Sequence, residues 1–274
     1  MTRPFTRLLH LGNVVVDVVL NVPALPEPGG DVFATGALTT AGGGFNVMAA
    51  AARQGLAVAY GGVIGTGPFA TLATAACAAE GIEVLRPAKP GPDTGLVISV
   101  VDAGGERTFL TTRGAEATLT AADLAPVRPA PGDAVYLSGY GLAHPSNAAA
   151  LHGWLGRLPD DHLVVLDPVP LAGALPDGVL RPVLARADWV TCNARESARL
   201  TGSADPREAL RVLAGRRSAR AEQAPGRADP DEYPGPRQPP GQHPHRLPRI
   251  RRTGEPGTLP GVAGHPVGPR QHRR

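Results

Sequence analysis

Lysine is almost absent from this 274-residue chain, because Lys89 is the only one and arginine supplies every other basic side chain. The two cysteines, Cys77 and Cys192, lie far apart without a CxxC motif, so the sequence predicts reduced thiols and a cytoplasmic protein. No apolar run approaches the roughly 20 residues that a membrane helix needs. The longest one, Val14–Leu20, is interrupted by Asp17. The first ten residues have no apolar segment of the kind found in secretory signals.

Apolar residues are also scarce after Arg216. Residues 216–274 contain 12 Pro and 12 Arg but only five Val, Ile or Leu, which is too few to offset the entropy of ordering such a segment. We therefore predict a folded domain over residues 1–215 and a disordered Pro/Arg-rich tail over residues 216–274. Five acidic residues leave the tail at +7 and, out of a net +3, the domain at −4. An acidic domain gives no reason to expect nucleic acid, whereas a basic tail can bind polyanions.

The first 215 residues alternate apolar, strand-like runs with helical stretches of small residues. The clearest elements are predicted strands over Leu8–Leu20, Ala134–Ser138 and Leu163–Asp167, and predicted helices over Val47–Gln54, Ser146–Leu158 and Pro206–Ala214. This alternation predicts an α/β fold with a doubly wound, mostly parallel sheet. Two segments, at about 17–40 and 94–113, interrupt the rhythm, and the second has the pattern of a hairpin. We expect these two segments to form a small separate β-sheet over one edge of the main sheet.

One candidate site residue is Asp17, which follows an apolar strand. Burying a carboxylate there is costly unless the group is paired or used, and ligands of open α/β sheets bind beyond the carboxyl ends of the strands. A carboxylate accepts two or more hydroxyl donors, which suits a polyhydroxylated ligand. A structural role in capping a turn is an equal alternative.

A second candidate is the glycine-rich segment Ala41–Asn46, Ala-Gly-Gly-Gly-Phe-Asn, which leads into a predicted helix. Glycines permit close approach of the backbone to a ligand, and a helix N-terminus offers free N–H groups. The segment is neither a dinucleotide-binding fingerprint nor a P-loop. Taken alone, a plain flexible turn is the simpler interpretation.

A third candidate follows the predicted strand Trp189–Cys192. Asn193-Ala-Arg-Glu196 opens a helix, so Asn193 as N-cap and Glu196 as its partner would form a capping box. The functional alternative is that Glu196 helps to hold a hydrated magnesium ion, which favours one or two carboxylates together with phosphates. Asp167-Pro168 also ends a strand, but this pair starts ordinary turns as well.

Together, these segments resemble the ribokinase-like, or PfkB, family of carbohydrate kinases over about residues 8–214. Gly12–Asp17 resembles the family's first strand with its substrate-binding Asp. Ala41–Asn46 is similar to the signature G-G-x-G-x-N, with Ala41 in place of the first Gly. Asn193-x-x-Glu196 resembles the family's N-x-x-E magnesium and phosphate motif.

Some stretches match the family pattern only in part. Thr94-Gly95 matches a pair at the start of a lid strand. Gly67 replaces the Asp, and Ala70 the last Gly, of G-x-x-G-x-D-x-x-G. Glu116 replaces the Asn of G-A-N. The order and spacing of all these motifs carry the resemblance rather than any one of them.

The resemblance implies ATP- and magnesium-dependent phosphorylation of a sugar or nucleoside hydroxyl, by a ribokinase-like fold with a small β lid. It implies a homodimer formed through that lid. It also assigns substrate contacts and a phosphate end, with the metal reached from Glu196 through water. The implied substrate residues are Asn13, Asp17, Gly42, Gly43 and Asn46, and the residues near magnesium and phosphate are Asn193 and Glu196.

The family's second signature, D-T-x-G-A-G-D, is absent, since Gly-Ala-Gly-Asp occurs nowhere in the chain. In the family it supplies an anion hole at a helix N-terminus and the catalytic base. We therefore predict an incomplete kinase, truncated or frame-shifted near Gly215, with little or no activity. The alternative is a non-catalytic sugar-binding protein whose basic tail binds a polyanion or a partner.

Overall fold

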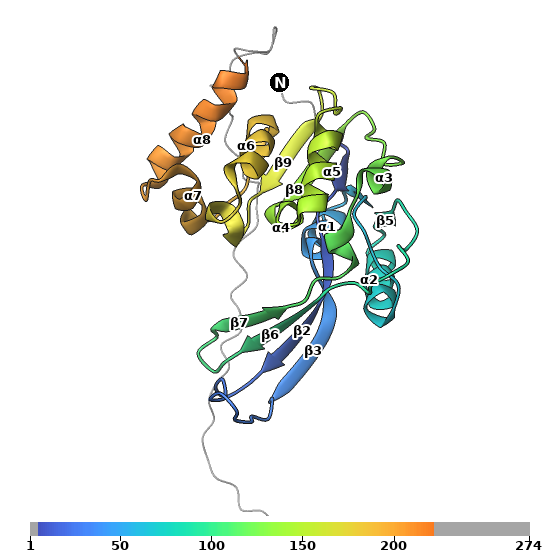
Figure 1. The fold of residues 1–274 in the computed structure, drawn as a ribbon, viewed down its shortest axis with the longest axis vertical. Helices are drawn as coiled ribbons and strands as arrows, with labels where there is room; N and C mark the ends of the chain where they lie inside the picture. Colours follow the sequence, from blue (N-terminus) through green and yellow to red (C-terminus); the bar gives the residue numbers. More distant parts are fainter. Residues whose placement is uncertain (1–4, 222–274) are drawn as a thin grey trace, which may run out of the picture. The chain divides into compact units, whose positions relative to one another are not determined.

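The computed structural model describes residues 5–221, with the side chains of residues 5–215, and contains two β-sheets (Figure 1). The larger sheet has six strands in the order β10-β9-β8-β1-β4-β5, and every neighbouring pair is parallel. The chain therefore winds outward from β1 in both directions, which confirms the predicted doubly wound sheet. Its strands are β1 (Arg7–His10), β4 (Ala57–Tyr60), β5 (Glu83–Val84), β8 (Asp133–Ser138), β9 (Leu163–Asp167) and β10 (Trp189–Val190).

Helices cover both faces of this central sheet, and each face has its own apolar core. Successive strand residues point to opposite faces, so Leu8 belongs to one core and Leu9 to the other. Helices α1 (Gly44–Arg53) and α2 (Pro68–Ala79) pack on the face of Leu8, and α5 (Pro145–Leu155) and α6 (Asp177–Arg186) on the face of Leu9. The shorter or peripheral helices are α3 (Ala121–Leu124), α4 (Gly139–Leu142), α7 (Ala194–Thr201), α8 (Pro206–Ala221), η1 (Ala115–Thr118) and η2 (Pro170–Gly173).

The smaller sheet has four strands in the order β3-β2-β6-β7. They are β2 (Val14–Asn21), β3 (Gly36–Gly43), β6 (Leu96–Val101) and β7 (Arg107–Thr111). The pair β2–β6 is parallel, whereas β3 and β7 are antiparallel to their neighbours. In this register Asp17 lies beside Thr40 on one side and Val97 on the other.

The apolar run predicted as a single strand, Leu8–Leu20, is divided between the two sheets. After β1 the backbone N–H of Gly12 donates to Nδ1 of His10 at 3.1 Å instead of continuing the central ladder. The chain then joins the small sheet at Val14. Asp17 is therefore an interior residue of a small-sheet strand, and not the end of a central strand as the sequence suggested.

Two helices extend further than predicted. Helix α1 begins at Gly44, three residues before the expected start at Val47, so the segment up to Asn46 forms its first turn. Helix α8 continues to Ala221, seven residues beyond the expected end at Ala214, because alanine and arginine favour helix despite the onset of the Pro/Arg-rich composition. The remainder of the predicted tail, residues 222–274, lies outside the described residues. Among the helices of residues 5–221, none is long and apolar enough to cross a membrane.

Candidate functional site

Residues 11–13 join β1 to β2 and form the link between the two sheets. His10, at the end of β1, is fully buried beside this link. Its ring stacks on that of Tyr136 with the centroids 4.9 Å apart. Burial lowers the pKa of His10 to about 3, so the imidazole is neutral. Because Nδ1 accepts the Gly12 N–H, the proton resides on Nε2, which has no partner within the described residues.

The glycine-rich segment closes over this link. The N–H of Gly44, the first residue of α1, donates to the carbonyl of Asn13 at 2.7 Å. A Cβ at Gly44 would lie 2.6 Å from that carbonyl oxygen and would overlap the His10 ring. Gly43 has φ 63, a value that favours glycine. The sequence thus folds α1 tightly against the link between the sheets, and only glycine fits there.

The carboxylate of Asp17 lies directly over Gly42 at the end of β3. A Cβ at Gly42 would be 2.7 Å from Oδ1 of Asp17 and closer still to Oδ2. Asp17 is partly buried, and burial raises the pKa of its carboxyl above the usual value. No hydrogen bond or ion pair reaches this carboxylate from the described part of the chain. Its two oxygens are therefore left to accept hydrogen bonds from a ligand.

The structure brings together four of the five substrate residues that the family resemblance implies. Asn13 contributes its carbonyl to α1, and its Nδ2 lies 3.4 Å from where a Cβ of Gly43 would be. We call the group formed by Asn13, Asp17, Gly42 and Gly43 the hydroxyl corner. The fifth residue, Asn46, is exposed in the first turn of α1.

Asn193 and Glu196 form the capping box that the sequence predicted as their structural role. The Glu196 N–H donates to Oδ1 of Asn193 at 2.9 Å, and the Asn193 N–H donates to Oε2 of Glu196 at 2.9 Å. Gly202, which has φ 79, caps the C-terminal end of α7. The pair therefore stabilises the start of α7, and Glu196 is 6% exposed.

Glu196, in the first turn of α7, and Asp167, the last residue of β9, both lie close enough to Tyr140 and Cys192 for their charges to act on these side chains. Burial raises the pKa of Tyr140, and the charges of Asp167 and Glu196 raise it further. Burial, Glu196 and Asp167 likewise raise the pKa of Cys192. Asp167 already accepts a hydrogen bond from the Tyr136 hydroxyl at 2.9 Å. These two carboxylates suit a hydrated cation held through water, and within residues 5–221 no group of three or more ligating side chains is placed to bind a metal directly.

Two residues of this region, His10 and Tyr136, were not predicted from the sequence. Together with Asp167 they form a chain of contacts from the link between the sheets to the end of β9. A tyrosine inside the apolar run of β8 was the available signal, since a buried phenol needs a hydrogen-bond partner. Two residues after Asp167, Val169 has φ 53, which is strained for a β-branched side chain.

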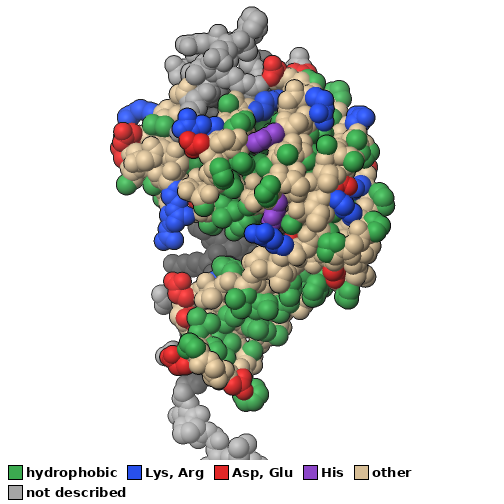
Figure 2. Space-filling view, in the orientation of Figure 1, with side chains coloured by type: hydrophobic (Ala, Val, Ile, Leu, Met, Phe, Trp, Pro, Cys, Tyr) green, Lys and Arg blue, Asp and Glu red, His purple; other side chains and the backbone are tan. Residues whose placement is uncertain are grey.

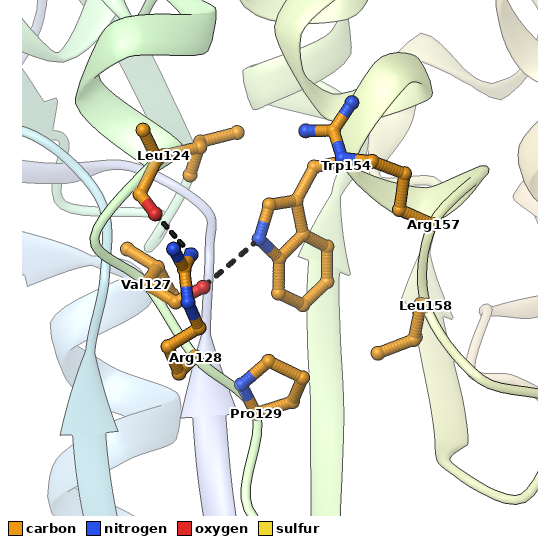
Figure 3. Close-up of a pocket in the computed structure, with 8 residues that line it drawn as sticks. Leu124, Val127, Arg128, Pro129, Trp154, Arg157 and Leu158 are labelled. Atoms are coloured by element: carbon orange, nitrogen blue, oxygen red, sulfur yellow. Dashed lines mark hydrogen bonds between the residues drawn. The ribbon is translucent and has the colours of Figure 1, made fainter.

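The structure also contains a shallow pocket of about 310 Å³ near the amino-terminal edge of the central sheet (Figure 3). Its lining includes the indole of Trp154, whose Nε1 donates to the carbonyl of Val127 at 3.2 Å, together with Arg128 and Arg157. The loop that forms it leads into the first residue of β8, at the amino-terminal edge of the sheet. Ligands of such sheets bind at the opposite edge, so the pocket is separate from the hydroxyl corner.

Comparison with known proteins gives matches over most of the described chain. The description "pfkB family carbohydrate kinase" matches residues 6–223. The uncharacterized sugar kinase YegV of Escherichia coli (strain K12) is 31% identical over 191 residues, which are 69% of this chain and 59% of YegV. This chain thus spans less than two thirds of the length of that relative.

Two solved structures share the fold. The fructokinase from Xylella fastidiosa has a TM-score of 0.61 and 22% identity, over 77% of this chain and 69% of its own. The Arabidopsis thaliana ribokinase complexed with ribose and ATP has a TM-score of 0.55 and 21% identity, over 80% and 69% of the two chains.

Proposed function

Because the chain belongs to the pfkB family of carbohydrate kinases, we propose that its hydroxyl corner binds a sugar or the sugar part of a nucleoside. One observation carries the proposal: the Asp17 carboxylate is partly buried, has no partner in the described chain and lies against a glycine that leaves room for it. Its two oxygens can each accept a hydroxyl donor of the same sugar. The backbone of Gly42 and Gly43 would contact the sugar, and the side chains of Asn13 and Asn46 would contribute further hydrogen bonds to its hydroxyls.

We propose ATP as the phosphoryl donor, in line with the family and with the ribokinase that was solved with ribose and ATP. Asn193 and Glu196 would lie near its phosphates. Magnesium, when bound, neutralises phosphate charge. Glu196 would hold it through water, since one of its oxygens already accepts the Asn193 N–H.

We further propose that the 274-residue chain transfers phosphate slowly or not at all. Its sequence has no Gly-Ala-Gly-Asp, the segment that the resemblance makes responsible for the anion hole and the base. A chain that binds sugar without turnover would be a non-catalytic sugar-binding protein. ATP-dependent phosphorylation well above background, measured on the purified chain with D-fructose, D-ribose and adenosine, would contradict this proposal.

The hydroxyl corner is tested by titration calorimetry with the same three compounds. We expect at least one of them to bind, and Asp17→Asn to weaken that binding about tenfold or more, because hydrogen bonds to charged groups are worth about 1.5–3 kcal/mol. Asp31→Asn is the matched control, since Asp31 is an exposed acidic residue between β2 and β3. Equal affinity in the wild-type chain and Asp17→Asn would refute the assignment.

The phosphate end is tested by Glu196→Gln. The amide oxygen can still accept the Asn193 N–H, so the capping box persists while the charge is removed. We expect the affinity for ATP to fall several-fold in the presence of magnesium and to change little without it, with the free energy of unfolding nearly unchanged. The same affinity for ATP with magnesium in both proteins would restrict Glu196 to its structural role.

We propose that the small sheet is the family's lid and that it also forms a homodimer. Hydrophobic side chains gather on the surface of the small sheet, at the lower end of the molecule in Figure 2. Leu38, Phe109 and Leu110 are exposed there by 60%, 58% and 63%. Leu38 and Phe109 share the face of Asp17, because each lies opposite a residue that points to that face. Analytical ultracentrifugation should give a dimer for the wild-type chain and a monomer for Phe109→Ser. A monomeric wild-type chain would contradict the proposed homodimer.

A further inference from the structure

The small sheet is tied to the central domain at two glycines, one where the chain enters β6 and one after it leaves β7. The N–H of Gly95 donates to Oε2 of Glu116 at 2.8 Å, and the N–H of Gly114 donates to Oε1 of the same carboxylate at 2.8 Å. Glu116 is 6% exposed. One buried carboxylate therefore holds both crossings of the chain, and it uses both of its oxygens to do so.

Neither glycine leaves room for a side chain at these crossings. A Cβ at Gly95 would lie 2.8 Å from Cδ of Glu116 and closer to one of its oxygens. A Cβ at Gly114 would lie 2.6 Å from the carbonyl carbon of Thr94. The two backbone segments thus pass each other in direct contact, with the carboxylate of Glu116 against both.

We call Glu116, with the two N–H groups that it accepts, the clamp. It is connected to the hydroxyl corner by one further hydrogen bond. The carbonyl of Gly95 accepts a hydrogen bond from the N–H of Val16 at 2.9 Å. Val16 is fully buried and precedes Asp17 in β2. This bond starts the pairing of β2 with β6, so the position of Gly95 fixes where Asp17 stands in the small sheet.

A second carboxylate, Asp93, holds the same segment from the other side. Asp93 accepts hydrogen bonds from the N–H groups of Phe69 and Ala70, at 3.0 and 2.8 Å, in the first turn of α2. It occupies the space of the missing side chain at Gly67, where a Cβ would lie 2.6 Å from its Cγ. Asp93 thus caps the helix beside Gly67, where the family pattern has its own Asp.

Two of the departures from the family pattern, Gly67 and Glu116, therefore meet at one three-residue segment, 93–95. We propose that Glu116 is a positioning residue for sugar recognition, which acts through Gly95 and Val16 on Asp17. This inference rests on the proposed function of the hydroxyl corner. Glu116 lies outside the hydroxyl corner, and its role is to keep the small sheet in register. The carboxylate of Asp17 is thereby held in the position in which it binds sugar.

The charge of Glu116 is central to this role because both of its oxygens accept N–H donors. In Glu116→Gln one acceptor becomes an NH₂ group, which must face the N–H of Gly95 or Gly114 in a buried place. We expect the affinity for the sugar to fall about tenfold, and the amides of Gly95 and Gly114 to exchange hydrogen about tenfold faster. The amides of β8 should exchange as in the wild-type chain.

The experiment combines hydrogen exchange with calorimetry on the full chain, using D-fructose, D-ribose and adenosine as probes. Glu106→Gln is the matched control, since Glu106 is an exposed glutamate in the turn between β6 and β7 whose carboxylate makes no bond within the described chain. In the Asp17→Asn background, Glu116→Gln should weaken binding little further, because its effect passes through Asp17. A loss that remains fully additive would show a general structural role and overturn the proposal.

The two measurements, calorimetry and hydrogen exchange, distinguish a failure of this inference from a failure of the proposed function. A wild-type chain that binds none of the probes refutes the proposed function, and exchange at Gly95 and Gly114 then decides the clamp alone. Unchanged exchange at both glycines, or unchanged affinity, overturns the role of Glu116. If Glu116→Gln does not fold, Glu116→Asp is judged by the same two measurements, since its shorter side chain keeps the charge but cannot span both amides.

Discussion

A methyl group added at Gly42 should abolish most sugar binding while leaving the fold almost intact. In Gly42→Ala the new Cβ would lie 2.7 Å from Oδ1 of Asp17 and nearer to Oδ2. Ordinary contacts begin at 3.4 Å, so Oδ1 must move by about 0.7 Å and Oδ2 by more. The backbone of Gly42 has no positive φ, so alanine is not strained at this position.

The size of the effect follows from what has to move. The Asp17 carboxylate has no partner within the described residues, so turning it away breaks no bond, and we expect a loss of less than about 1 kcal/mol in the free energy of unfolding. Sugar binding, in contrast, loses the charge-assisted hydrogen bonds of Asp17, each worth about 1.5–3 kcal/mol. One such bond corresponds to about a 10- to 150-fold increase in Kd.

Calorimetry and urea unfolding on four proteins decide the matter: wild type, Gly42→Ala, Asp17→Ala and the double variant. In the Asp17→Ala background the methyl group has no carboxylate to displace, so the second substitution should change Kd less than about twofold. Gly36→Ala, at the other end of β3, is the control for an added methyl group in the same strand. Full additivity of the two substitutions would refute the reasoning.

Two further predictions concern stability. The pKa of His10 is lowered by burial to about 3. The stability that the neutral imidazole contributes is therefore complete above its ordinary pKa of 6.5, and it is lost as the pH falls below that value. Between pH 7.5 and 5.0 this costs about 2 kcal/mol in the free energy of unfolding, which urea titration should detect in the wild-type chain and find missing in His10→Gln. Asp123 is paired with both Arg86 at 2.6 Å and Lys89 at 2.7 Å. Asp123→Asn leaves these cations unpaired and should lower the free energy of unfolding by about 3 kcal/mol; a loss within about 1 kcal/mol, the size of a surface pair, would contradict this.

The class of fold followed from sequence because apolar strands alternate with helices along the chain. The division of Leu8–Leu20 did not follow, since Leu8–His10 and Val14–Val16 are equally buried and equally apolar except for His10. The break depends on the bond between Gly12 and His10 and on the stacking of His10 on Tyr136. Tyr136 is 126 residues further along the chain, so no local pattern could reveal it.

The hydroxyl corner was easier to find than its support. A charge within an apolar strand and three successive glycines are unusual locally, so Asp17 and Gly42 could be named from sequence. Glu116 and Asp93 look like ordinary surface acids in sequence. Their roles become visible only when Gly95 meets Glu116, 21 residues away, and when Asp93 fills the space beside Gly67.

The link of residues 11–13 has a mechanical consequence for the small sheet. Strand β2 leaves it at Val14 and runs for eight residues. At about 3.4 Å per residue, Asp17 is about 10 Å from the link and Asn21 about 24 Å. A rotation of about 10° there would carry the far end of the strand through about 4 Å but Asp17 through only about 2 Å. A small sheet joined at this link can move far at its tip while the carboxylate of Asp17 stays close to its place.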